Sequence, residues 1–254
     1  MPTETINGAD LYYESAGDGP AIVLLHGVLM SSRFFSEQQP LSDTYQLISL
    51  DFRGHGRSEK TDTGHTLPQY ARDLEAFLDA RALSDVVVVG WSMGSLVAWE
   101  YMRQFGTDRL QGFVSVDQQP LDLEQEGYEH GVFDFADLSG LMELTQTDPH
   151  AVAQSFVDEM LVDEPESVRQ TLFDEITRVP PPIMNAILFD QSVRDYREVV
   201  PESDVPTLVC LGEDETMVEN AGVEYVADTT PAAELERFSE SGHCPFLEEP
   251  DRFN

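Results

Sequence analysis

The sequence predicts an α/β protein with a mostly parallel eight-stranded sheet, flanking helices and an inserted helical lid. Short apolar runs bounded by Gly, Pro or Asp alternate with stretches of helical spacing, a pattern typical of parallel strands connected by helices. Continuous runs such as Val86–Val89 suit strands that are covered on both faces. The alternation stops after Asp117 and resumes at Val205, and this helix-like interval is too long for an ordinary loop.

The first strands are expected to form a hairpin. Thr3–Ile6 and Asp10–Glu14 flank Asn7-Gly8, a dipeptide that favours tight hairpin turns. Six further strands are predicted from the apolar runs, in chain order Ala21–Leu25, Tyr45–Leu50, Val86–Val89, Gly112–Val116, Thr207–Leu211 and Glu234–Phe238. Helical spacing occurs in Pro68–Ala80 and Ser95–Phe105. We expect residues 1–117 and 205–254 to form the core domain and residues 118–204 to form the lid.

The chain is strongly acidic. Its 254 residues include 48 Asp and Glu against 14 basic residues, and the formal net charge is −34. Lys60 is the only lysine. Carboxylates dispersed along the whole chain, almost without lysine, resemble the composition of proteins from salt-loving organisms, in particular haloarchaea. Because such a surface repels phosphate groups, we expect neither nucleic acid nor an anionic membrane as a partner.

Other features of the sequence narrow the class of protein. No apolar run reaches the roughly 18 residues of a transmembrane helix, and no secretory signal is visible, so we expect a cytoplasmic protein. Two cysteines, Cys210 and Cys244, are too few for a disulfide framework or a four-cysteine zinc site, and we interpret both as packing residues. Metal-ligand spacing and a Gly-rich phosphate loop are both missing from the sequence, so no cofactor is expected.

A serine at a strand-to-helix turn is the candidate nucleophile. Gly90-Trp91-Ser92-Met93-Gly94 follows the strand Val86–Val89 and precedes a helical stretch. Such a sharp turn holds the serine hydroxyl exposed, and it needs glycines where a side chain would clash. We therefore predict that Ser92 attacks the substrate.

Two backbone N–H groups are candidates for stabilising the charge that develops on the substrate. His26-Gly27-Val28 follows the strand Ala21–Leu25, which places this loop at the carboxyl edge of the sheet beside the serine. The N–H groups of Val28 and Met93 are expected to form an oxyanion hole. We interpret His26 as a residue that braces the loop.

A histidine after the final strand is the candidate general base. Ser241-Gly242-His243 follows Glu234–Phe238, so the loop lies at the same edge of the sheet. There His243 is expected to take the proton of Ser92 and later return it to the leaving group.

Together these motifs resemble the α/β-hydrolase superfamily, in which serine, acid and histidine follow one another in this order. The branch most similar to the sequence is that of esterases and cofactor-free, non-heme haloperoxidase-like hydrolases. The resemblance covers nearly the whole chain and rests on His26-Gly27, the segment 51–58, Gly90–Gly94, Gly242-His243, Glu248 and Pro250. It implies that segment 51–58 is a structural loop. Members of the superfamily usually continue into a final helix, whereas this sequence ends at Asn254.

The resemblance leaves the acid of the triad open among three residues. The usual family pattern is an aspartate three positions after a glycine that follows the penultimate strand. After Gly212 that position is Glu215, and Asp214 stands one position earlier. Some relatives carry the acid after the preceding strand, where this sequence has Asp117. Asp117 and Glu215 are equally good candidates for the triad acid, and Asp214 is a weaker one.

The leading hypothesis is a serine hydrolase that cleaves a carboxylic ester or related small acyl substrate through an acyl-enzyme. Alternatives at the same site are carbon–carbon bond hydrolysis of a diketone and cofactor-free perhydrolysis, in which peroxide attacks the acyl-enzyme. A non-catalytic ligand binder with this fold is an alternative of another class. The serine on the turn argues against haloalkane dehalogenases and epoxide hydrolases, which use a carboxylate there.

Apolar residues of the lid suggest an apolar substrate pocket, and for each residue singly packing of the lid on the core is an alternative of at least equal weight. These residues are Phe133, Phe135, Met142, Phe156, Met160, Met184 and Phe189.

The charge predicts a fold that depends on salt. Self-repulsion among the carboxylates destabilises the compact state at low ionic strength, and molar salt shortens the Debye length to about 3 Å. Far-ultraviolet circular dichroism should therefore show secondary structure in molar KCl and its loss after dialysis into dilute buffer. Identical spectra under both conditions would contradict the salt-loving interpretation.

Overall fold

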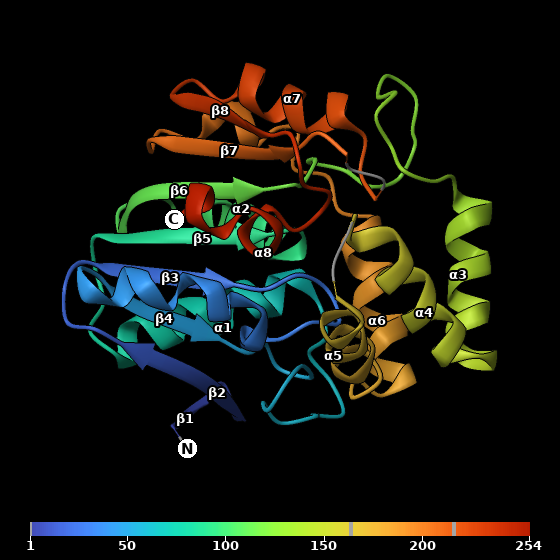
Figure 1. The fold of residues 1–254 in the computed structure, drawn as a ribbon, viewed down its shortest axis with the longest axis horizontal. Helices are drawn as coiled ribbons and strands as arrows, with labels where there is room; N and C mark the ends of the chain where they lie inside the picture. Colours follow the sequence, from blue (N-terminus) through green and yellow to red (C-terminus); the bar gives the residue numbers. More distant parts are fainter. Residues whose placement is uncertain (1, 163–164, 215–216) are drawn as a thin grey trace.

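An eight-stranded sheet forms the centre of the protein (Figure 1). The computed structural model describes residues 2–162, 165–214 and 217–254. The strands are β1 (Thr3–Ile6), β2 (Ala9–Ala16), β3 (Ala21–Leu25), β4 (Gln46–Leu50), β5 (Val86–Trp91), β6 (Leu110–Val116), β7 (Thr207–Gly212) and β8 (Ala233–Phe238). Their order across the sheet is β1-β2-β4-β3-β5-β6-β7-β8. The pairs β1–β2 and β2–β4 are antiparallel, and every later pair is parallel.

Helices cover both faces of this sheet. Helices α1 (Leu67–Ala80) and α2 (Met93–Phe105) contact each other behind the sheet in Figure 1. In front lie the 3-10 segment η1 (Ser32–Asp43) and the short helices α8 (Pro245–Glu248) and α9 (Pro250–Phe253). Helix α7 (Asn220–Thr229) packs on β7 and β8. None of the described helices has the length and apolar character needed to cross a bilayer.

A helical region is inserted between β6 and β7. It consists of α3 (Phe135–Thr147), α4 (Pro149–Met160), α5 (Glu166–Ile176) and α6 (Pro181–Ser192), followed by the 3-10 turn η2 (Val200–Glu202). These four helices lie beyond the carboxyl ends of β3, β5 and β6, on the right of Figure 1. The predicted fold class, with its inserted helical region, is therefore confirmed.

The predicted elements differ from the observed ones mainly at their ends. The strand predicted over Val86–Val89 continues to Trp91, and the helix predicted from Ser95 begins at Met93. Both differences shorten the turn that carries Ser92. Tertiary packing, which a local pattern does not contain, decides such boundaries.

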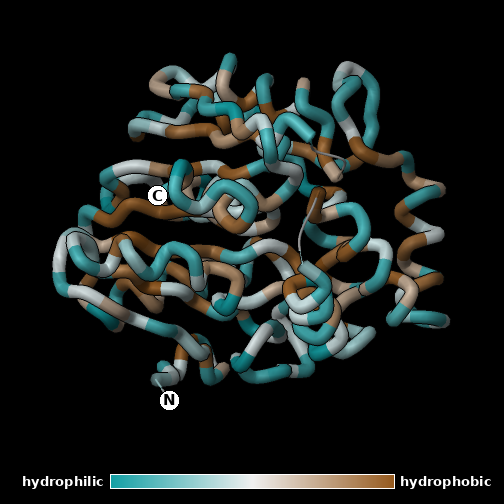
Figure 2. Tube along the Cα trace, in the orientation of Figure 1, coloured by the Kyte–Doolittle hydropathy of each residue, from teal (hydrophilic) through white to brown (hydrophobic). Residues whose placement is uncertain are grey.

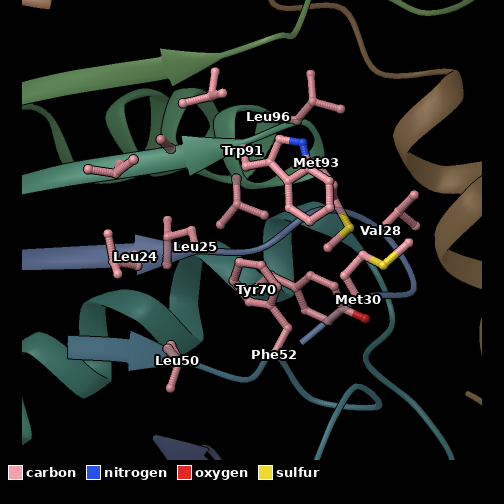
Figure 3. Packing of buried hydrophobic residues seen from close by; sticks show 14 of the residues in the cluster. Leu24, Leu25, Val28, Met30, Leu50, Phe52, Tyr70, Trp91, Met93 and Leu96 are labelled. Carbon is pink, nitrogen blue, oxygen red and sulfur yellow. The ribbon is translucent and has the colours of Figure 1, made fainter. Parts of the chain in front are cut away.

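The hydrophobic core lies on the central strands and reaches the site of interest. Figure 2 shows hydrophobic residues concentrated along these strands. Near their carboxyl ends, Phe52 and Tyr70 stack with ring centroids 5.1 Å apart. Trp91, Met93 and Val28 pack in the same cluster (Figure 3). The turns after β3, β4 and β5 therefore share one packed support.

The loop after β4 is fastened by polar bonds. The Asp51 carboxylate accepts the backbone N–H groups of Ser32 and Arg57, each at 2.6 Å. The ammonium group of Lys60 donates to the carbonyls of His55, Gly56 and Ser58 of the same loop, at 3.0, 2.5 and 3.0 Å. These contacts fit the structural role expected for segment 51–58.

Helix α2 starts in close contact with β3. A Cβ atom at Gly94 would lie 2.1 Å from the carbonyl oxygen of Leu25. Real side chains do not tolerate such a distance to a backbone atom. Gly94 therefore allows the first turn of α2, and with it the turn that carries Ser92, to approach the sheet.

We predict that Gly94→Ala lowers the free energy of unfolding by about 3 kcal/mol, because either the helix or the strand must move. Gly140→Ala is the matched control. This glycine lies inside α3, where a Cβ meets no atom within 4 Å, and the substitution should stabilise the protein by about 0.5–1 kcal/mol. Urea unfolding in molar KCl measures both values. Equal stabilities of Gly94→Ala and wild type would show that this contact does not constrain the fold.

Candidate active site

Ser92 lies in the turn between β5 and α2. Its φ of 51° and ψ of −122° are unusual for a residue other than glycine. The backbone N–H of Ser92 donates to the carbonyl of Val116 at 2.9 Å, which holds the turn against β6. A Cβ at Gly90 would lie 2.5 Å from the backbone nitrogen of Ser95. The turn has the strand–turn–helix geometry in which a serine side chain is held above a parallel sheet.

His243 lies in the loop after β8, far along the chain from Ser92 but beside it in space. The indole Nε1 of Trp91 donates to the His243 carbonyl at 2.8 Å, and the His243 N–H donates to the Met160 carbonyl at 3.2 Å. The side chain is buried. The histidine loop is therefore attached to the turn that carries Ser92 and to the end of α4.

Two carboxylates near the C-terminus, one at the end of α8 and one between α8 and α9, position the histidine loop. Glu248 accepts the backbone N–H of Gly242 at 2.9 Å, and Glu249 accepts the hydroxyl of Ser241 at 2.8 Å. Partial burial acts to raise the pKa of Glu249, but hydrogen bonds from the N–H of Glu240 and from the side chains of Ser241 and Arg252 together hold it below its usual value. Glu248 belongs to the motif that carries the family resemblance, and the structure shows what its carboxylate binds.

The structure brings Ser92, His243 and Val28 together around one cavity. This cavity, which we call the inner chamber, has a volume of about 70 Å³. The backbone N–H of Met93 lies in the first turn of α2, where helical N–H groups have no intrahelical acceptor. Neither this N–H nor that of Val28 donates to an acceptor among the described residues. Of the two residues, Val28 lines the chamber, whereas Met93 is not among its lining residues.

His26 lies in the loop that carries Val28, and both of its ring nitrogens are hydrogen-bonded to backbone groups. Its Nδ1 lies 2.7 Å from the carbonyl of Gly27, and its Nε2 accepts the N–H of Phe52 at 3.1 Å. This pair of bonds requires the neutral ring with the proton on Nδ1. Burial lowers the pKa of His26, which favours the same neutral form. The geometry agrees with a bracing role.

Of the three candidate acids, Asp117 lies beside the histidine. Its Oδ2 is 3.9 Å from Nδ1 of His243, and its side chain is fully buried. Asp117 has a φ of 48°, and its Oδ1 accepts the N–H of Gly212 at 3.3 Å. Asp214 is exposed in the turn after β7. Glu215 lies outside the described residues.

Sequence reasoning missed three polar residues of the inner chamber. Gln118 and Asp122 follow β6, Gln191 lies near the end of α6, and all three line the chamber with Ser92 and His243. Burial raises the pKa of Asp122 to about 6, although hydrogen bonds from Gln118 and Gln191 and the proximity of His243 act in the opposite direction. One carboxylate among 48 gives no signal in the sequence, so only the fold could identify it.

A larger pocket of about 790 Å³, which we call the vestibule, adjoins the inner chamber. The two share six lining residues, namely Val132, Phe133, Leu141, Phe156, Met217 and Val218. The vestibule and the inner chamber are therefore neighbouring cavities. Acidic residues at the vestibule are Glu159, Glu219 and Glu224.

Only part of the predicted apolar lining is found there. Phe133 and Phe156 line both cavities. Phe135 and Phe189 are instead exposed, by 64% and 44%. Met160 and Met184 are buried in the core, and Met142 packs on it. The three methionines thus follow the alternative of packing on the core, and neither cavity is lined by any of these five residues, because the packing of each helix decides which of its faces meets the pocket.

Metal ligation is not indicated in the described part of the chain. No group of three or more His, Cys, Asp or Glu there has an arrangement that could hold a metal ion. Cys210 and Cys244 are both buried, and burial raises the pKa of the Cys210 thiol well above its ordinary value.

The raised pKa of Asp122 predicts a pH-dependent stability. Between the ordinary value of 3.8 and about 6 the folded protein binds more protons at this group than the unfolded chain does, so its contribution to stability is lost as pH rises through this range. Asp122→Asn removes the contribution. The free energy of unfolding of the variant, relative to wild type, should increase from pH 4 to pH 7 by up to about 3 kcal/mol. Urea unfolding in molar KCl checks this, and a difference independent of pH would contradict it.

Comparison with known proteins places the chain in a family. Residues 20–250 match the model of the alpha/beta hydrolase fold family. The non-heme chloroperoxidase CPO-A1 of Kitasatospora aureofaciens is 27% identical over 249 residues, which are 94% of this chain and 90% of that protein. A Bacillus subtilis protein, the AB hydrolase superfamily protein YisY, is 26% identical over 96% of this chain and 92% of its own.

Solved structures give the same result. The esterase EaEST of Exiguobacterium antarcticum superimposes with a TM-score of 0.94 at 25% identity, covering 99% of this chain and 95% of that one. A bromoperoxidase of Bacillus anthracis has the same TM-score at 24% identity, with coverage of 100% and 96%, and supports the fold. The chain therefore belongs to the α/β-hydrolase family, and within it is similar to esterases and non-heme haloperoxidases.

Proposed function

We propose that this protein is a serine hydrolase that cleaves a carboxylic ester or a related small acyl substrate. The observation that carries the proposal is the position of Ser92 and His243 on the wall of one chamber. A nucleophile and a general base that face the same small cavity can act on one bound carbonyl. The names of the related esterases support the same reaction class.

The proposed reaction has two halves. Ser92 Oγ attacks the carbonyl carbon of the ester while His243 takes the hydroxyl proton. The N–H groups of Val28 and Met93 stabilise the oxyanion of the tetrahedral intermediate. His243 then protonates the leaving alcohol, which departs from an acyl-enzyme. Water attacks the acyl-enzyme through the same base, releasing the acid and restoring Ser92.

Asp117 is our choice for the acid that orients His243. A buried carboxylate beside an imidazole fixes its tautomer and stabilises its charged form during proton transfer. The distance of 3.9 Å between Asp117 and His243 supports this assignment. Glu215, at the position usual for the family, is the alternative.

Peroxide chemistry is a second activity proposed for the same site. The similarity to non-heme chloroperoxidases supports it. Hydrogen peroxide would replace water as the nucleophile that attacks the acyl-enzyme, and the products would be a peracid and free Ser92. The peracid would then oxidise halide away from the protein, so no cofactor is required.

The setting of this activity is also part of the proposal. The formal charge of −34 supports a protein that works at high salt, in the cytoplasm of a salt-loving organism. Residues 118–204 would act as a lid domain over the core formed by 1–117 and 205–254. The vestibule between α3, α4 and α7 would then be the entrance for substrate.

The triad predicts a specific pattern of inactive variants. Ser92→Ala and His243→Ala should each lower kcat for p-nitrophenyl esters, from acetate to octanoate, by about 10⁴–10⁶-fold, because the two groups act as a unit. Ser139→Ala and His150→Ala, which change exposed residues, are the matched controls and should retain wild-type rates. Assays in molar KCl, with circular dichroism to verify folding, measure the effect. Activity of folded Ser92→Ala close to wild type would overturn the acyl-enzyme mechanism.

The same series identifies the acid. Asp117→Asn should lower kcat by about 10⁴-fold, since it removes the charge that orients His243. Asp214→Asn changes an exposed carboxylate of similar size and should have little effect. Loss of activity in Glu215→Gln with retention in Asp117→Asn would instead assign the role to Glu215.

A further inference from the structure

The wall of the inner chamber that lies next to the catalytic pair is polar and buried. Gln118, Asp122 and Gln191 are exposed by only 2%, 5% and 8%. All three line the chamber, together with Ser92 and His243. Buried polar groups on a chamber of this size must be satisfied by the protein or by what enters the chamber.

The amide N–H groups of this wall donate hydrogen bonds to other groups of the protein. The amide Nε2 of Gln118 donates to the carbonyl of Gln119 at 2.9 Å and to Oδ1 of Asp122 at 2.8 Å. Both amide protons of Gln118 are therefore used. The Nε2 of Gln191 lies 3.4 Å from Oδ2 of Asp122. A carboxylate only accepts, so this contact fixes which end of the Gln191 amide faces Asp122.

After these bonds are made, the wall still has hydrogen-bond acceptors that receive no proton from the described residues. With Nε2 of Gln191 turned to Asp122, its Oε1 is buried and has no donor among the described residues. A carboxylate has about four lone-pair sites, and the described side chains donate to each oxygen of Asp122 once. An unsatisfied buried acceptor is costly, and a ligand that supplies a proton removes that cost.

We infer that Gln191 and Asp122 form a specificity subsite for a hydrogen-bond donor, a hydroxyl or an amide N–H, on the acyl part of the substrate. The inference rests on the proposed function, because it assumes that the scissile carbonyl occupies the inner chamber. The acyl part is favoured over the leaving group for a steric reason. A chamber of about 70 Å³ admits a short acyl chain, whereas the vestibule of about 790 Å³ gives the leaving group its exit.

The negative charges of the protein around the site restrict the substrate class further. A carboxylate on the acyl chain would face Asp122 in a buried site, where like charges repel strongly. A negatively charged substrate that entered through the vestibule would also pass the carboxylates of Glu159, Glu219 and Glu224. Short hydroxyacyl or amidoacyl esters without a negative charge therefore fit the site, and dicarboxylic half-esters do not.

Binding to an inactive protein tests the subsite without requiring turnover. Ser92→Ala would be titrated by calorimetry in molar KCl with methyl butanoate, methyl 2-hydroxybutanoate and methyl 3-hydroxybutanoate. We expect at least one hydroxy ester to bind about tenfold more tightly than methyl butanoate. In Ser92→Ala/Gln191→Leu this preference should fall to within about twofold. Ser92→Ala/Gln170→Leu, with its exchange at an exposed position of α5, is the matched control and should keep the preference.

Hydrolysis of the same esters by the wild-type protein separates this inference from the proposed function. Hydrolysis of all three with equal kcat/KM, together with equal affinities in Ser92→Ala, would overturn the subsite and leave the hydrolase intact. Selective binding of a hydroxy ester without hydrolysis would retain the subsite and overturn the hydrolase. If Gln191→Leu fails to fold, the comparison of the three esters in Ser92→Ala alone still decides the question.

Discussion

The close packing of the β5–α2 turn against β3 is the constraint on which the rest of the site depends. Gly94 lets the first turn of α2 approach the Leu25 carbonyl at a distance that excludes any side chain. The same turn holds Ser92 at a positive φ and leaves the Met93 N–H without an intrahelical acceptor. One backbone geometry thus sets the position of the proposed nucleophile and of one proposed oxyanion donor. A looser turn would lose both together.

The remaining groups reach this turn because parallel strands end at one edge of the sheet. The loops after β3, β6 and β8 supply Val28, Asp117 and His243. Neighbouring strands hold two of these loops: Trp91, at the end of β5, donates to the His243 carbonyl, and the N–H of Gly212, at the end of β7, donates to Asp117. The inserted helices contribute Gln191 and apolar lining of the chamber. The core thus carries the proposed chemistry, and the helical region lines both cavities.

The acidic composition also has a role inside the fold. Carboxylates bind backbone N–H groups at Asp51, Glu248 and Glu249, where they fix loops around the site. The few cationic side chains also bind groups inside the fold. Lys60 bonds three carbonyls of one loop, and Arg53 forms a buried pair with Asp73. Dispersed carboxylates therefore act both as a solvated surface and as the main acceptors of these loops.

The sequence by itself determined the fold class, the strands, and the turn and loop that carry Ser92 and His243. These features follow from local patterns, namely apolar periodicity, Gly spacing and position after a strand. The tertiary structure alone decided which apolar helix faces meet the pocket, how near Asp117 lies to His243, and that Asp122 and Gln191 share one wall. Asp122 and Gln191 lie 69 residues apart in the chain. Contacts between distant segments depend on how the helices pack on the sheet, and no local pattern records that packing.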